Sequence, residues 1–86
     1  MDIDTLINMA CEKQLNGYAK EAEKLYLIAA QQGSGHAAHN LGVLDITGGK
    51  DLEPDLEKSQ YWLQQSLESG FEATVASDPE WFKRTN

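Results

Sequence analysis

One amphipathic pattern occurs twice in this 86-residue chain, and it constrains the fold more than any other feature. Each copy has apolar or small residues at i, i+3, i+4, i+7 and i+8, the spacing that marks one face of a helix. The second copy comprises Ser59, Trp62, Leu63, Ser66 and Leu67, and the first, 37 residues earlier, comprises Ala22, Leu25, Tyr26, Ala29 and Ala30. Gly33 and Gly70 follow the copies at equivalent positions, where glycine favours a helix C-cap. An internal duplication of this length predicts a helical repeat protein.

Turn and cap signals divide the chain into four expected helices. They cover about residues 4–15, 19–32, 36–47 and 55–70. Asn16-Gly17, Gly33-Ser34-Gly35 and the loop 48–54 separate them, and Asp55 after Pro54 is a strong N-cap. Gly42 lies inside the third helix, where glycine costs about 1 kcal/mol relative to alanine. We therefore expect the second or fourth helix to approach closely at Gly42.

Charge and size restrict the function classes. Fourteen acidic and seven basic residues give a net charge of −7, which argues against binding to nucleic acid or anionic membranes. This charge fits a basic protein partner, and it fits solubility alone equally well. The length allows one domain, residues 1–86.

The cysteine content and the N-terminus indicate a cytoplasmic protein. Cys11 is the single cysteine, so no intrachain disulfide can form, and its position in a helical pattern favours a small buried apolar role. The first ten residues lack the basic and apolar regions of a signal peptide. No apolar run is long enough to span a membrane.

Paired positions that recur in both copies resemble the Sel-one-like repeats, relatives of the tetratricopeptide repeats. In the second copy these positions are Asn40-Leu41-Gly42-Val43-Leu44, Gly48-Gly49, Asp55, Lys58-Ser59, Trp62-Leu63, Ser66-Leu67 and Gly70. In the first they are Met9-Ala10, Asn16-Gly17, Glu21-Ala22, Leu25-Tyr26, Ala29-Ala30 and Gly33. The resemblance covers about residues 4–73. It implies an all-α fold, a short α-solenoid of two helix-turn-helix repeats, with adaptor or scaffold activity.

The chain also departs from this family pattern. Asp45 stands where the family usually has tyrosine, and Ser66-Leu67 replaces an alanine pair. Two repeats, about 4–35 and 36–70, are fewer than the three that normally share a continuous core. We therefore expect residues 71–86 to form a capping helix over the exposed end, and a homodimer that stacks the repeat ends is the alternative.

The segment from Gly48 to Trp62 matches neither a phosphate-binding loop nor a calcium-binding loop. Gly48-Gly49-Lys50 is followed by Asp51, where a phosphate-binding loop needs serine or threonine. A calcium loop starting at Asp51 would need glycine in place of Leu56 and glutamate in place of Trp62. A solvated acidic loop is the better interpretation, and Asp51 and Glu53 are a second-choice contact for a protein partner.

Metal and catalytic sites are not predicted. His36 and His39 lie three residues apart, but no cysteine pair or HExxH spacing supplies the other zinc ligands. No local signature supports a catalytic triad. We expect no catalytic residue, metal or cofactor, and no enzyme activity.

In helical repeats of this class the first helix of each repeat lines the concave binding surface. If Leu41-Gly42 faces a neighbouring helix, the residues that face this groove are Asp4, Ile7, Cys11, Gln14, His36, His39, Val43 and Ile46. We call these eight residues the predicted α-groove. Some of them, Ile7 and Cys11 above all, could instead be core residues. Charge reversal of His39 and Asp45 is expected to weaken partner binding if the groove carries it.

The sequence therefore predicts a non-enzymatic interaction module that binds a protein or peptide. The alternative is a small acidic immunity or inhibitor protein that neutralises a basic toxin or nuclease, because opposite charge speeds association. Trp62 is expected to support the fold by packing against the first helix of its repeat near Gly42, rather than to contact a partner.

Overall fold

The computed structural model describes residues 1–71, and these form an all-helical fold of four helices with no strand. The helices are α1 (Ile3–Leu15), α2 (Ala19–Gln31), α3 (Gly35–Thr47) and α4 (Leu56–Glu68). This arrangement confirms the all-α prediction. The expected capping helix at 71–86 lies outside the described residues, apart from Phe71.

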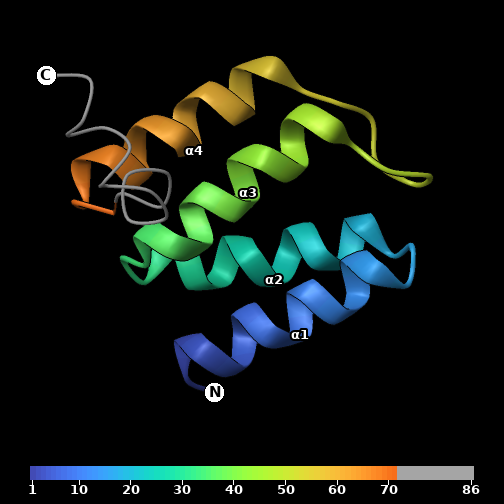
Figure 1. Ribbon diagram of the computed structural model, residues 1–86, viewed down its shortest axis with the longest axis horizontal. Coiled ribbons are helices and arrows are strands. Elements are labelled where there is room, and N and C mark those ends of the chain that lie inside the picture. Colours follow the sequence, from blue (N-terminus) through green and yellow to red (C-terminus); the bar gives the residue numbers. More distant parts are fainter. Residues whose placement is uncertain (72–86) are drawn as a thin grey trace, which may run out of the picture.

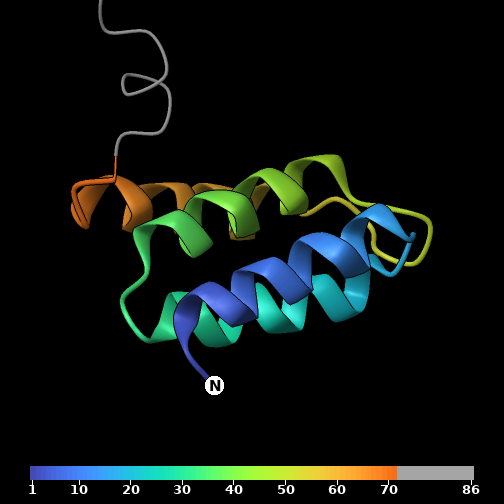
Figure 2. The ribbon, with the colours of Figure 1, turned by 60° about the horizontal axis from the view of Figure 1, so that its bottom comes forward.

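The helices form two antiparallel pairs. Figure 2 shows α1 with α2 as one layer and α3 with α4 as the other. The two layers meet where α2 packs against α3, and Figure 1 shows α3 lying between α2 and α4. Because α4 packs mainly against α3, one side of α4 is left at the edge of the fold.

Side-chain caps begin three of the helices, and Asp55 is the cap that the sequence predicts for α4. Asp2, Ser34 and Asp55 accept hydrogen bonds from backbone N–H groups in the first turns of α1, α3 and α4, which leaves fewer of these donors unpaired. Ser34 caps α3 one residue earlier than expected, so that helix begins at Gly35. Gly70 has a φ of 88°, as expected for the glycine after α4.

The N-cap residue of α2, Tyr18, provides no side-chain hydrogen bond. Instead Asp51, in the loop between α3 and α4, lies 3.3 Å from the backbone nitrogen of Lys20 in the first turn of α2. The acidic loop therefore ties the second helix pair to the start of α2. This contact gives Asp51 a structural role in addition to the predicted partner contact, which remains a prediction.

Truncation of Asp51 should measure this contact. Asp51→Ala is expected to lower the free energy of unfolding by about 1 kcal/mol, because it removes the only side-chain acceptor in the first turn of α2 among the described residues. Urea denaturation followed by circular dichroism measures the change. Glu53→Ala, a neutralised acid in the same exposed loop, is the matched control and should change stability by less than about 0.5 kcal/mol.

The core lies between the two layers. Its buried apolar residues are Leu6, Ile7, Ala10, Ala19, Ala22, Tyr26, Ala29, Ala30, Ala37, Ala38, Leu41 and Leu44. Seven of these twelve are alanines, so the helices approach closely instead of interdigitating large side chains. α3 contributes four residues of one helix face to this core, Ala37, Ala38, Leu41 and Leu44.

Small residues also bring α3 and α4 together. Gly42 faces α4, and a Cβ atom added there would lie 2.7 Å from Cγ of Leu63 and 3.2 Å from the backbone oxygen of Ser59. The buried Ser59 hydroxyl donates to the Gly42 carbonyl at 2.8 Å. Two helical turns away, the buried Ser66 hydroxyl donates to the Gly35 carbonyl at 2.9 Å. The expected close approach at Gly42 is confirmed, with α4 as the neighbouring helix.

The predicted buried face of α4 is wrong at one position. Ser59 and Ser66 are buried and Trp62 is half-buried, but Leu67 is 67% exposed. The reason is that α4 packs mainly against α3, so only a narrow stripe of α4 is covered. Leu67, the i+8 position of the pattern that begins at Ser59, lies outside that stripe.

Candidate functional site

A groove runs along α3 between α2 and α4. Ala38, Leu41 and Asp45, at the i, i+3 and i+7 spacing of one helix face, form its floor. Its α2 wall contains Glu23, Leu27 and Ala30, and its α4 wall contains Lys58, Trp62 and Gln65. We call these nine residues the α2–α4 groove. It consists of two pockets, and the half-buried Trp62 lines both of them.

The two ends of the groove differ in chemistry. The end near Ala38 is bounded mainly by small residues, Ala30 and Gly33 to Gly35, with the Glu68 carboxylate beside them, and has a volume of about 240 Å³. The end near Asp45 has a volume of about 150 Å³ and adds two carboxylates and one ammonium group to its apolar walls. From Ala38 to Asp45 the floor spans about two helical turns, or roughly 10 Å, which is the length of about three residues of extended chain.

Asp45 is the least expected residue of this groove. Its side chain is 1% exposed, and neither carboxylate oxygen has a hydrogen-bond partner. Burial, followed by the nearby Glu23 carboxylate, raises the pKa of Asp45 to about 7, and the charge of Lys58 opposes this rise only in part. An unpaired buried carboxylate is costly, and positions of this kind are often functional.

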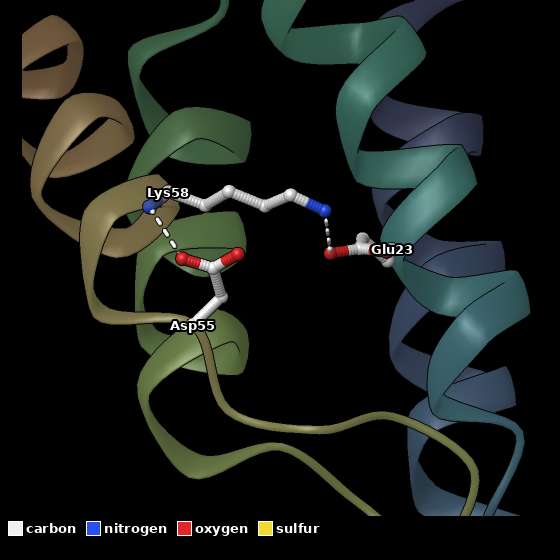
Figure 3. Close-up of polar contacts among 3 residues, drawn as sticks. All are labelled: Glu23, Asp55 and Lys58. Atoms are coloured by element: carbon white, nitrogen blue, oxygen red, sulfur yellow. Dashed lines mark hydrogen bonds and ion pairs between the residues drawn. The ribbon is translucent and has the colours of Figure 1, made fainter.

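Lys58 connects the two walls of the groove. Figure 3 shows its side chain extending from α4 to Glu23 on α2, where Nζ lies 3.9 Å from the Glu23 carboxylate. Its backbone nitrogen donates to Asp55, so the lysine belongs to the capped first turn of α4. The 3.9 Å separation is long for an ion pair, and the side chain of Lys58 is 58% exposed. A pair of this length and exposure contributes little to stability and can be replaced easily.

The structure separates the predicted α-groove into two parts. α1 packs against α2 and α3 packs against α4, whereas α1 and α3 share no substantial interface. The α1 part is mostly engaged within the fold: Ile7 is a core residue, and Cys11 and Gln14 both contact the Tyr26 hydroxyl at 3.1 Å. Only Asp4 is exposed without such a contact. Ile7 is therefore a core residue and does not face a groove.

The α3 part of the predicted α-groove is more accessible. Val43 and Ile46 are 40% and 48% exposed. The His36 ring stacks on Phe71 with 5.2 Å between centroids, and the His39 ring lies 5.6 Å from the same phenyl group. These four residues share one face of α3, so partner binding there remains a prediction. Asp45, by contrast, is buried on another face of α3 and would not respond to charge reversal as a surface group.

Residues 1–71 contain no group of three metal-ligating side chains and no helix that is long and apolar enough to span a membrane.

Sequence reasoning missed the α2–α4 groove, although a signal was present. Asp45 follows Leu41 by four residues and Ala38 by seven, so an acid occupies the buried face of an otherwise apolar helix. Asp45 also stands at the position where the Sel-one-like repeat pattern usually has tyrosine. An acid on a predicted core face, at the place where a family pattern breaks, would have pointed to this site.

No protein-family model, curated protein or solved structure matches the chain.

Proposed function

We propose that this chain is a non-enzymatic protein-interaction module built from two Sel-one-like helix pairs. It holds a short segment of a protein partner in the α2–α4 groove. The observation that carries the proposal is the groove itself: a half-buried tryptophan joins two pockets, and one pocket contains a buried carboxylate without a partner. Open apolar surface beside a few oriented polar groups is typical of a binding site.

The net charge of −7 supports a basic partner, because charge complementarity speeds encounter and disfavours acidic competitors. An adaptor needs only moderate affinity for such a partner. The same charge supports the second candidate, an acidic immunity or inhibitor protein, which would bind one basic toxin or nuclease tightly. In that case the association rate should fall steeply as salt is added.

Two adjacent glutamines of α4 offer a matched pair for the test. Gln65 lines the α2–α4 groove, whereas Gln64 lines neither pocket, is exposed and donates to the Glu68 carboxylate. Gln65→Arg should reduce partner capture about tenfold or more, because a bulky cation obstructs the groove and repels a basic segment. Gln64→Arg adds the same charge one residue away and should leave capture unchanged. The measurement is quantitative copurification from the organism that produces the protein, followed by mass spectrometry.

A third variant separates the two candidate surfaces. Val43→Glu changes the exposed face of α3 outside the α2–α4 groove. If Val43→Glu abolishes capture while Gln65→Arg does not, the predicted α-groove binds the partner. If all three variants behave as the wild type, the partner binds neither of these two surfaces and the proposal fails.

A further inference from the structure

The pocket at the Asp45 end of the α2–α4 groove contains a charge that the fold leaves uncompensated. Two carboxylates, Glu23 on α2 and Asp45 on α3, line it together with one ammonium group, that of Lys58. Lys58 pairs with Glu23, and nothing among the described residues donates to Asp45. A third carboxylate nearby, Asp55, already accepts the backbone N–H of Lys58 as the cap of α4. When Asp45 is ionised, the pocket is therefore short of one cation.

The walls of this pocket suit the carbon stem and planar head of a cationic side chain. Leu27 and Leu41 provide apolar surface, and the Trp62 indole is half-buried at the side. The volume of about 150 Å³ equals that of an engineered cavity that holds benzene. An aromatic ring beside a desolvated cation adds a favourable cation–π interaction.

We propose that this pocket binds the guanidinium group of an arginine side chain from the protein partner, between Asp45 and Trp62. The inference rests on the proposed function, because it names the chemistry by which the α2–α4 groove would recognise its partner. The two unpaired oxygens of Asp45 accept the parallel N–H groups of the guanidinium, and the indole stacks on its plane. The ammonium of Lys58 moves outward into solvent when the arginine enters, since its pair with Glu23 is long and exposed.

Arginine fits this pocket better than lysine. A guanidinium is more weakly hydrated than an ammonium and gives two parallel hydrogen bonds to one carboxylate. An ammonium is already present on Lys58, and it reaches Glu23 without donating to Asp45. A planar donor inserted from the partner reaches the floor of the pocket.

The test uses the isotope-labelled full chain and small probes followed by NMR. N-acetyl-arginine amide is the probe, N-acetyl-citrulline amide is its neutral isostere, and N-acetyl-lysine amide is the ammonium counterpart. The arginine probe should shift the resonances of Asp45 and the Trp62 indole, and it should bind about tenfold or more tightly than the citrulline probe. The lysine probe should bind more weakly than the arginine probe.

Two variants should change this affinity in opposite directions. Asp45→Asn should weaken arginine binding about tenfold or more, since the acceptor loses its charge. Lys58→Met keeps the apolar stem and removes the internal competitor, so it should strengthen binding about threefold or more. Glu12→Gln removes one negative charge from the exposed surface of α1 and is the control, with unchanged affinity expected.

Equal binding of the arginine and citrulline probes, or unchanged arginine binding by Asp45→Asn, would overturn this inference. A natural partner whose capture depends on Gln65 but not on Asp45 would overturn it as well, while leaving the proposed function intact. Conversely, arginine binding that follows these rules in a protein that captures no partner overturns the proposed function alone.

Discussion

Gly42→Leu should lower the free energy of unfolding by about 3 kcal/mol, a large part of the stability of a domain of this size. Even a single added Cβ would lie 2.7 Å from Cγ of Leu63, and the Ser59 backbone oxygen limits any movement of α4. Leucine is a better helix former than glycine by nearly 1 kcal/mol. A loss of stability must therefore come from the interface between α3 and α4. Urea denaturation followed by circular dichroism measures it.

Val43→Leu is the matched control for this prediction. It places leucine at the next position of α3, where the side chain is 40% exposed, and should change stability by less than about 0.5 kcal/mol. A double-mutant cycle with Leu63→Ala should show favourable coupling, because the smaller side chain makes room for the new one. Unchanged stability of Gly42→Leu would show that α3 and α4 do not approach closely at this point.

Asp45→Asn should raise the free energy of unfolding at pH 8. It should also remove most of the loss of stability that the wild type shows as the pH rises from 4 to 8. The pKa of Asp45 is about 7 in the folded protein and near 3.8 when unfolded, so the folded state binds the extra proton between these values. The contribution of Asp45 to stability is therefore fully present below pH 4 and is lost as the pH rises through 7. The loss amounts to a few kcal/mol, at most about 4.

The measurement is the free energy of unfolding from urea titrations between pH 4 and pH 8. Asparagine has nearly the same shape as aspartate and can donate to Glu23, so the variant should exceed wild-type stability at pH 8. Glu53→Gln removes the same charge from the exposed loop and should leave the slope unchanged. If the free energy of unfolding of Asp45→Asn falls with pH as steeply as that of the wild type, a group other than Asp45 causes the pH dependence.

The sequence predicted the elements of this fold well, because local chemistry determines them. Three cap residues and the turn glycines place the helix ends, and the period of the apolar residues identifies the inward face of α3. Gly42 was recognised as a close contact from its helix-breaking character alone. The exposure of Leu67 was missed, because periodicity does not reveal how many neighbours a helix has.

The candidate site was harder to predict, because it depends on which helices become neighbours. Glu23, Asp45 and Lys58 are separated by more than a dozen residues each and meet only when α2 and α4 pack on both sides of α3. The predicted α-groove assumed that α1 and α3 form one surface. In the structure each of them packs mainly against a different neighbour.

The pKa of the Asp45 carboxyl group, measured by NMR titration of its side-chain carbon resonance, tests most directly whether the α2–α4 groove ends in a buried carboxylate without a partner. A value near 7 in the wild type, raised further in Lys58→Met because the opposing charge is removed, is the expected result. A value near 3.8 that Lys58→Met leaves unchanged would show that Asp45 is solvated, and the binding pocket argued from it would not exist.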